Sequence, residues 1–363
     1  MSKANNSLTS LALQKFKRNF WGVFSFWFIV LVGLFSIFAY VIAPDNSPYA
    51  NQMNLSIHSK KPGFKVDVIL MPTDNVKQST FNKLFFGDKN SPVQIPISNY
   101  ILNEDQLVYT EYASDVLVGI TKSISLDTFK SSNPKDFITT KTFWFGTDKY
   151  GRDLLSRLLV GARISFFIGF VAVFISLIIG ILLGSVAGYF GGKVDAIIMW
   201  LINVTWSIPT LLLVIAITLA LGKGFWQVFI AVGLTMWVEV ARVVRGQIIS
   251  AKEMQYVTAA RALGFNDFRI ITRHILPNIM APVIVISAAN FAAAILIESG
   301  LSFLGIGAQP PMASWGAMIK DHYNYIILGK PYLALIPGLC IMSLVMAFML
   351  IGNTLRDALD VKS

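Results

Sequence analysis

Charged residues are scarce in this sequence, and their scarcity excludes an ordinary soluble protein. Of the 363 residues, 14% are Asp, Glu, Lys or Arg and 55% are hydrophobic. Soluble domains carry about a quarter charged residues, so the composition indicates a membrane protein. The net charge of +10 would fit a nucleic-acid partner only as a concentrated basic patch. Most of it borders long apolar runs instead, so we expect no nucleic-acid partner.

The sequence also lacks the residues that disulfides, metals and nucleotides require. Its one cysteine, Cys340, lies within an apolar run, which excludes an internal disulfide. No GxxxxGK[ST] phosphate loop occurs, so we expect no ATPase site in this chain. His58 stands alone in a polar stretch, and no group of His, Cys or acidic residues resembles a catalytic or metal site. We therefore expect no catalytic residue, no metal and no cofactor.

What the sequence does contain is a set of apolar runs of about the ~20 residues that a membrane helix needs. The first is too long for a cleavable signal peptide. The pattern predicts an all-α polytopic membrane protein with six transmembrane helices. The runs are Phe20 to Ile42, Ile164 to Tyr189, Ala196 to Leu221, Phe225 to about Val244, Ile279 to Ile297 and Tyr332 to Gly352.

The distribution of Lys and Arg predicts the orientation of these spans. The N-terminal tail carries four, 191–194 carries one, 242–273 carries six and the C-terminal tail carries two. If the spans alternate, these segments share one side, which the positive-inside rule makes cytoplasmic. The opposite side has Lys223, Lys320 and Lys330 in its short loops. We expect both termini on the cytoplasmic side of the membrane.

Three arginines do not fit this rule, because they precede the second span on the side expected to be outside. They lie in the segment GRDLLSRLLVGARISF, at positions 152, 157 and 163. Leucines at 154, 155, 158 and 159 fall largely opposite them on a helix. This pattern predicts an interfacial helix along the membrane surface.

A long polar stretch separates the first two spans. From Asp45 to Lys149 it holds eleven Lys, no Arg and eleven acidic residues, so it is neutral. Short alternating runs such as PVQIPISNYIL and QLVYTEY are separated by turn-forming residues. We expect a small β-rich extracytoplasmic insertion, whose function the sequence does not indicate.

The most informative segment lies between spans four and five and reads SAKEMQYVTAARALGFNDFRIITRHILPN. Glu253 to Leu263 is expected to form a short helix that Gly264 ends, and Asn266 or Asp267 can cap a second helix. Small alanines and exposed arginines on the first helix would suit a helix-in-groove contact with a partner. The alternative is a basic connector bound to anionic lipid head groups.

These residues resemble the Glu-Ala-Ala loop of permease subunits of type I ATP-binding-cassette importers. In that loop two alanines are followed by Gly and then by a Leu-Pro pair, and this sequence supplies all five at matching distances. Thr258 stands where the family usually has Glu, and His274 where it usually has Ile. The matching residues are Ala259, Ala260, Gly264, Leu276 and Pro277.

The segments FGTDKYGRDLLSRLLVGARISFFIG, ESGLSFLGIG and IGNTLRDALD extend the resemblance to the C-type permeases of dipeptide and oligopeptide importers. The resemblance implies the type I fold, a multi-pass location in a bacterial plasma membrane and a heterodimer with a second permease. It also implies two cytoplasmic ATPases that bind ATP and Mg, and an extracytoplasmic solute-binding protein. It further implies that the loop couples to the ATPases, through Glu253, Tyr256, Val257, Thr258, Ala259, Ala260, Arg261, Gly264, Arg269 and Pro277.

With the coupling loop placed, the sequence divides into five parts. They are a cytoplasmic tail (1–19), a first transmembrane helix (20–43), an extracytoplasmic domain (44–149), a permease core (150–355) with its coupling loop (245–277), and a cytoplasmic tail (356–363). A secondary transporter would need midplane ion sites and inverted repeats, and a membrane sensor would need a signalling constellation. We find none of these in the sequence.

Spans whose backbones can bend or pack closely are candidates for lining the translocation path. Pro209 interrupts the third span, and Ser287 and Asn290 lie in a run of small residues in the fifth. The same small residues also suit tight helix packing. Glu239, Arg242 and Glu298 lie near expected span ends, where we expect them to reach water, and Glu239 can pair with Arg242.

Overall fold

The computed structural model describes residues 8–73, 76–103, 105–113, 119–129, 133–222 and 224–359. Residues 1–7 of the expected N-terminal tail, Lys223, and residues 360–363 of the expected C-terminal tail lie outside these ranges. The chain divides into two compact units. The helical unit comprises Met1–Val32, Ser165–Ala308 and Cys340–Ser363, and the mixed unit comprises Gly33–Ile164 and Gln309–Leu339.

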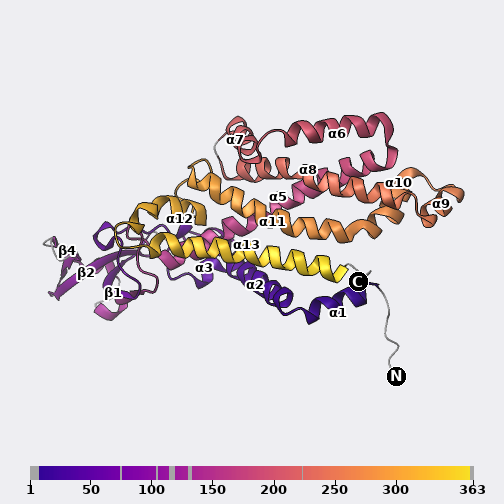
Figure 1. Cartoon of the computed structure of the whole chain (residues 1–363). Helices are drawn as coiled ribbons and strands as arrows, with labels where there is room; N and C mark the ends of the chain where they lie inside the picture. Colours follow the sequence, from indigo (N-terminus) through magenta and orange to yellow (C-terminus); the bar gives the residue numbers. More distant parts are fainter. Residues whose placement is uncertain are drawn as a thin grey trace, which may run out of the picture. The chain divides into compact units, whose positions relative to one another are not determined.

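Long apolar helices account for the membrane-spanning part of the chain (Figure 1). Five are long and apolar enough to cross a membrane, and a bent pair makes a sixth if it counts as one span. That number agrees with the six predicted spans. The helices are α2 (Phe20–Ile37), α5 (Leu154–Phe190), the bent pair α6 (Gly192–Trp206) and α7 (Thr210–Leu221), α8 (Phe225–Ala251), α11 (Met280–Phe303) and α13 (Tyr332–Leu359).

Shorter helices lie between the spans and within the insertion. The α-helical ones are α1 (Leu8–Arg18), α3 (Ala39–Ile42), α4 (Thr80–Phe86), α9 (Gln255–Ala262), α10 (Asp267–Arg269) and α12 (Trp315–His322). The 3-10 turns are η1 (Pro48–Ala50), η2 (Leu55–Ile57), η3 (Leu126–Phe129), η4 (Pro134–Asp136), η6 (Leu276–Ile279) and η7 (Tyr323–Ile326), and η5 (Ile270–Ile275) is a π-helix.

Three glycines let α5 approach α8 closely. Gly180, Gly184 and Gly188 recur every four residues, so they share one face of α5. A Cβ added at Gly184 would lie 2.5 Å from the carbonyl oxygen of Ala241, and one at Gly188 would lie 2.8 Å from that of Arg245. No larger residue fits these positions without moving α8. This is the small-residue packing by which membrane helices associate in the absence of a hydrophobic driving force.

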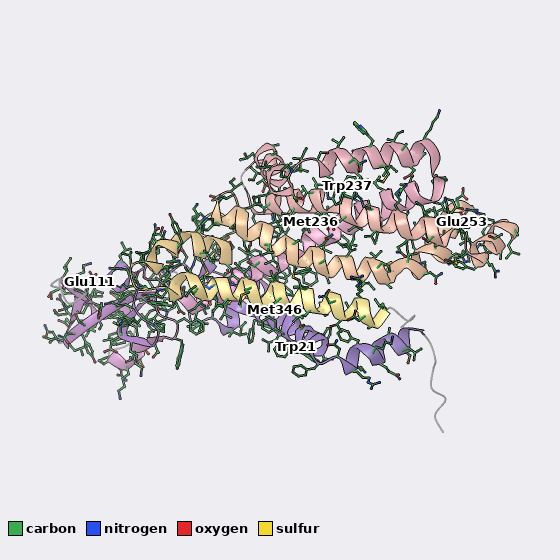
Figure 2. The ribbon with its side chains drawn as sticks, viewed as in Figure 1. Trp21, Glu111, Met236, Trp237, Glu253 and Met346 are labelled. Atoms are coloured by element: carbon green, nitrogen blue, oxygen red, sulfur yellow. The ribbon has the colours of Figure 1, made fainter. Side chains whose placement is uncertain are left out.

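Helix α8 is the central element of the helical unit. Its consecutive residues Met236 and Trp237 are both buried (Figure 2). Met236 belongs to an apolar cluster with residues of α5, α7 and α11. Trp237 belongs to a second cluster with Ile198 and Ile202 of α6. Because α8 contacts helices on several sides, it is buried more completely than the other spans.

The third span is broken, as Pro209 in the sequence predicts. Helices α6 and α7 meet at 92°. Pro209 precedes α7 with φ −53° and ψ 126°, which is outside the helical region. A proline lacks the N–H of the helical ladder and disfavours a helical conformation in the residue before it. The ladder therefore stops between Ser207 and Thr210, and this stretch is exposed.

The expected β-rich insertion is present as a five-stranded antiparallel sheet with strand order β4-β3-β2-β1-β5. One face packs Ile69, Ile97 and Leu107 against Phe129 and Phe137, whose rings are 4.2 Å apart. A second cluster contains Val66, Val68 and Phe143 together with Ile57. The strands are β1 (Phe64–Met71), β2 (Val93–Leu102), β3 (Gln106–Glu111), β4 (Thr121–Ser125) and β5 (Ile138–Phe143).

The predicted interfacial helix with surface arginines is wrong. The segment from Leu154 continues without a break into α5, whose 37 residues give a length of ~56 Å against ~30 Å for a bilayer core. Arg152 and Arg157 are buried within the mixed unit, and Arg163 donates to the carbonyl of Phe85 (2.8 Å). Arg152 and Arg157 are therefore interior residues of this unit and Arg163 is half-buried, so none of the three is a free short-loop charge.

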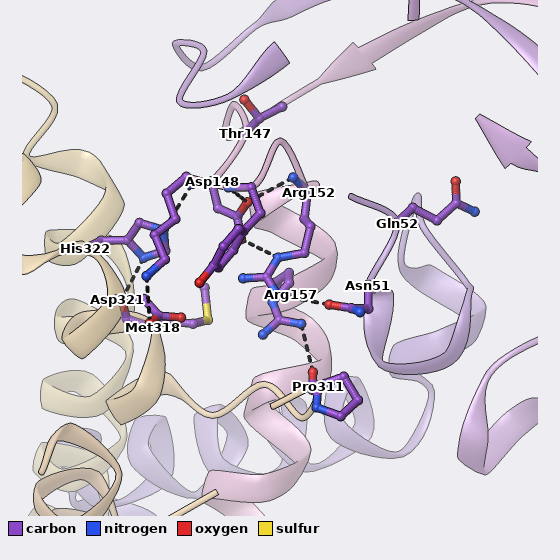
Figure 3. A network of polar contacts seen from close by, with 12 residues as sticks. Asn51, Gln52, Thr147, Asp148, Arg152, Arg157, Pro311, Met318, Asp321 and His322 are labelled. Carbon is purple, nitrogen blue, oxygen red and sulfur yellow. Dashed lines mark hydrogen bonds and ion pairs between the residues drawn. The ribbon is translucent and has the colours of Figure 1, made fainter. Parts of the chain in front are cut away.

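Buried polar groups hold these arginines in place (Figure 3). Arg152 pairs with Asp148 (2.6 Å) and donates to Asn51 (2.9 Å). Arg157 donates to the backbone carbonyls of Tyr49 and Pro311, each at 3.1 Å. The network thus joins the chain after the first span, the start of α5 and the segment that precedes α12. Buried charges persist only when they are paired and hydrogen-bonded in this way.

Two expectations for the membrane charges are also wrong. Glu298 does not reach water: it is 1% exposed within α11 and accepts hydrogen bonds from Ser302 (2.7 Å) and Ser165 (3.4 Å). Among the described residues, Glu239 and Arg242 form no ion pair. The guanidinium of Arg242 instead lies 3.6 Å from the ring centre of Trp206. An aromatic face is a competitive partner for a desolvated arginine.

Candidate coupling site

The short helix predicted between spans four and five is α9, which begins two residues later than expected, at Gln255, and ends at Ala262. Val257 and Ala260 are its buried residues. They pack in one cluster with Ile248 of α8 and with Ile270 and Ile275 of η5. This apolar anchor fixes which face of α9 points outward.

Gly264 ends α9 in the left-handed conformation that its position predicts, with φ +77°. Its N–H donates to the carbonyl of Arg261 (2.9 Å), and the N–H of Phe265 donates to that of Ala260 (3.2 Å). These two bonds together form a Schellman motif, which satisfies carbonyls that the helix end would leave free. The chain direction after α9 therefore depends on a residue that accepts positive φ.

The next turn is capped as the sequence predicts. The Asn266 side chain accepts a hydrogen bond from the N–H of Arg269 (2.9 Å) at the start of α10. Asp267 accepts a hydrogen bond from the hydroxyl of Tyr189 at the end of α5 (2.6 Å). The guanidinium of Arg261 lies 5.4 Å from the ring centre of the same tyrosine. Tyr189 thus ties α5 to both short helices, a role that no local sequence signal indicated.

Pro277 explains the irregular helix that follows. It occupies the first turn of η6, and a proline removes one N–H from the ladder and clashes with the carbonyl four residues earlier. The preceding residues form a π-helix, so the regular ladder is interrupted on the N-terminal side of the proline as well. Asn278 donates to the carbonyl of His274 (2.6 Å). His274, where the resembling family has Ile, stacks on Phe265 with ring centres 5.5 Å apart.

The outward face of this segment is more apolar than a water-exposed surface requires. Leu263 is 73% exposed and Phe268 is 76% exposed, and Met254 and Tyr256 are exposed as well. Clustered exposed apolar side chains mark an interaction site. Of the ten predicted coupling residues, Val257 and Ala260 point inward. The remaining eight are exposed: Glu253, Tyr256, Thr258, Ala259, Arg261, Gly264, Arg269 and Pro277.

The three residues proposed for the translocation path lie in different environments. Pro209 is exposed at the break in the third span, and Ser287 is half-buried with its hydroxyl donating to the carbonyl of Val283 (2.6 Å). Asn290 is fully buried, and its side-chain atoms have no hydrogen-bond partner among the described residues. The structure does not bring the three together through any hydrogen bond between described residues.

An apolar cavity of about 440 Å³ runs beside this part of α11. Its walls combine residues of α11 with Val243 of α8 and the C-terminal end of α13. A smaller cavity of about 190 Å³ shares two of the same residues, Val285 and Ala289. The larger one is lined by Val243, Ala281, Pro282, Val285, Ile286, Ala289, Arg356 and Leu359.

Comparison with known proteins identifies this arrangement of spans as that of a transport permease. Residues 180–362 match the family described as binding-protein-dependent transport system inner membrane component. Residues 7–62 match the N-terminal transmembrane domain of oligopeptide transport permease C. The chain belongs to the binding-protein-dependent transport family and is a permease subunit of an ATP-binding-cassette importer. The family assignment favours this function over a secondary transporter or a membrane sensor.

Individual relatives agree with the family match. A dipeptide transport system permease of Bacillus subtilis is 44% identical over 60% of this chain and 68% of its own length. A second dipeptide permease, from Alkalihalophilus pseudofirmus, is 40% identical over 69% of this chain and 83% of its own. A glutathione transport permease of Pectobacterium atrosepticum is 41% identical over 60% and 72%.

Proposed function

We propose that this permease subunit forms, with a second permease, the membrane pathway for dipeptides, longer peptides or related small solutes such as glutathione. The functions of these relatives support this substrate class, because all of them concern short peptides or a peptide-like molecule. An extracytoplasmic solute-binding protein delivers the substrate. Uptake of a labelled dipeptide, with glutathione as a competitor, separates the two kinds of substrate.

ATP hydrolysis is proposed to belong to two partner ATPases, which bind ATP and Mg. The support is the lack of a phosphate-binding loop in this chain. The isolated subunit is then expected not to hydrolyse ATP, whereas the assembled complex does. Hydrolysis by the purified subunit alone would contradict this assignment.

The segment from Gln255 to Arg269 is proposed to be the docking site for one ATPase. One observation carries this proposal: the short helix α9, anchored by buried Val257 and Ala260, is followed by a turn and by α10, which present the exposed apolar side chains of Leu263 and Phe268. A rigid element with a hydrophobic outer face suits insertion into a groove of a partner. Glu253, Arg261 and Arg269 then form the polar rim of the contact.

This docking requires the segment to be cytoplasmic, and the distribution of Lys and Arg supports that orientation. Both termini then lie in the cytoplasm and the β-sheet lies outside. Cysteine probes test the orientation in a Cys340→Ser background. A probe at Ser98 is expected to react in intact cells and a probe at Thr258 only after permeabilisation. The reverse pattern would invert the protein and remove the docking proposal.

The docking itself is tested by placing charge on the exposed apolar face. Leu263→Glu and Phe268→Glu are expected to release the ATPases on purification and to abolish uptake at equal membrane abundance. Phe81→Glu is the matched control, because Phe81 is a similarly exposed aromatic residue in α4 of the insertion. Normal uptake and normal ATPase recovery with both site variants would refute the docking role.

The translocation path is proposed to pass the broken third span at Pro209 and the face of α11 that carries Ser287 and Asn290. Support comes from the apolar cavity beside Ala281, Pro282 and Ala289, since small residues leave room for a moving solute or a partner helix. Cysteines at these positions, labelled with and without substrate, test this placement. Reactivity that substrate never changes would contradict it.

A further inference from the structure

Helix α1 is the short helix that precedes the first span, and it takes no part in the proposed coupling. It is separate from α2, because the ladder breaks at Asn19, whose side chain accepts a hydrogen bond from the N–H of Gly22 (3.0 Å) and so caps α2. The rings of Phe16 and Phe26 are 6.5 Å apart. A straight helix would separate these residues by ~15 Å along its axis. The chain therefore turns at Asn19, and α1 is no extension of α2 (Figure 1).

The position of α1 places it at the membrane surface. Helix α2 is apolar enough to cross a bilayer and begins at Phe20. Phe20 and Trp21 are exposed, and aromatic residues of this kind concentrate where a span meets the head groups. Because α1 ends only two residues earlier and turns away from the axis of α2, it stays near this boundary.

The faces of α1 match a boundary between apolar and polar surroundings. Ala12 is buried, Phe16 packs on Phe26, and Leu13 is 54% exposed beside them. Ser10, Gln14 and Arg18 occupy the opposite side of the helix, where Leu11 is the one apolar residue near them. Lys15, Lys17 and Arg18 form its last turn. Long basic side chains at such a border extend their apolar stems over the hydrocarbon and place their charges among the head groups.

The charge of the N-terminal region indicates which kind of membrane surface α1 binds. No Asp or Glu precedes Asp45, whereas the same stretch contains four Lys or Arg. We propose that α1 lies in the membrane surface and binds anionic phospholipid head groups, so that it holds the start of α2 at a fixed depth. The ligand of α1 is then the layer of negatively charged phosphate groups that lies above the hydrocarbon of the bilayer. An acidic surface of a partner protein is the competing occupant, which the test below identifies.

The test uses the assembled importer in nanodiscs with an environment-sensitive fluorophore in a Cys340→Ser background. A label at Leu13→Cys is expected to be quenched by lipids that carry a spin label near the head group, whereas a label at Gln14→Cys is quenched much less. Each basic residue near an anionic surface contributes about fivefold to binding. The Lys15→Gln, Lys17→Gln, Arg18→Gln triple variant should therefore weaken surface binding roughly a hundredfold in phosphatidylglycerol discs and far less in phosphatidylcholine discs.

The matched control removes three exposed lysines from the insertion instead, with Lys61→Gln, Lys65→Gln and Lys77→Gln, and it should leave the quenching unchanged. Added salt should weaken the contact of the unmodified protein in anionic discs. Equal quenching in both lipids, or no loss in the triple variant, would overturn the proposal. So would crosslinking of position 13 to an ATPase or to the second permease, which would assign the basic face to a protein partner.

Discussion

Replacement of Gly264 isolates the contribution of one backbone conformation to coupling. A Cβ at this position would meet no atom within 4 Å, so the substitution causes no steric clash. The whole effect comes from φ +77°, which costs a residue with a side chain about 1 kcal/mol and a β-branched one up to about 3 kcal/mol. Asn tolerates this conformation better than other residues. The expected order of damage is therefore Val, then Ala, then Asn.

A cost of about 2 kcal/mol shifts a local equilibrium roughly 30-fold, which is enough to release the Schellman motif and misdirect α9. The same cost is small for the whole protein, because the motif involves two hydrogen bonds at the end of one short helix. Gly264→Val should therefore leave membrane insertion and pairing with the second permease intact. It should reduce uptake and ATPase co-purification together.

The assay is uptake of a labelled dipeptide together with recovery of the ATPases, compared at equal membrane abundance. Gly246→Val is the matched control, because Gly246 also has open space around it but sits in the regular helix α8. Uptake at the unmodified level with Gly264→Val would refute the reasoning. Loss of the protein from the membrane would show that the glycine serves folding.

Three further predictions follow from buried polar groups. His322 donates from Nδ1 to the carbonyl of Met318 (2.7 Å) and accepts at Nε2 from the N–H of Lys149 (3.3 Å), and burial lowers its pKa from 6.5 despite the nearby Asp148 and Asp321. The folded form then binds fewer protons than the unfolded one, so this contact is fully stable above about pH 6.5 and weakens as the pH falls below it. Hydrogen exchange of residues 146–152, compared at pH 7.5 and 5.5, measures this change in stability. The His322→Gln variant should remove the pH dependence. Glu298→Ala should lower the stability of the purified complex by about 2 kcal/mol, because it leaves Ser302 and Ser165 without their acceptor, and an unchanged melting temperature would contradict this. Asn290→Ala should raise stability by about 1 kcal/mol, since it removes a buried amide that has no hydrogen-bond partner among the described residues. A loss of uptake in spite of that gain would support its place in the path.

The sequence was most informative where a local rule acts alone. Apolar length identified the six spans, Pro209 identified the break in the third, and Gly264 with Asn266 identified the end of one short helix and the start of the next. Each of these depends on neighbours within a few residues. Local backbone chemistry therefore transfers directly from sequence to structure.

The sequence was least informative where distant segments meet. Arg152 and Arg157 looked like surface charges because Asp148, Asn51 and the carbonyl of Pro311 become their partners only after folding. Glu298 looked like a residue at the water boundary for the same reason. The hydroxyl of Tyr189 reaches Asp267 across 78 positions, and no periodicity within α5 signals that contact.

Helix α9 shows both cases in one element. Its Gly264 stop could be predicted, but the contact argument treated Ala259 and Ala260 alike, and the structure shows that Ala259 is exposed whereas Ala260 is buried. Both are small, and the choice between them depends on how Val257 meets Ile270 and Ile248. The residue types indicated a helix that contacts a partner. Which of its faces points outward is decided by its packing and could not be predicted.

The broken third span has a consequence for how the cell makes this protein. Helices α6 and α7 have 15 and 12 residues, or ~22 Å and ~18 Å, and neither crosses a ~30 Å hydrocarbon layer. Irregular backbone at that depth persists only where protein or a water-filled space covers it. A newly inserted chain is therefore expected to expose this bend until the proposed second permease covers it. Its lifetime in the membrane should then depend on the supply of that subunit, so that unpaired copies are removed by membrane proteases.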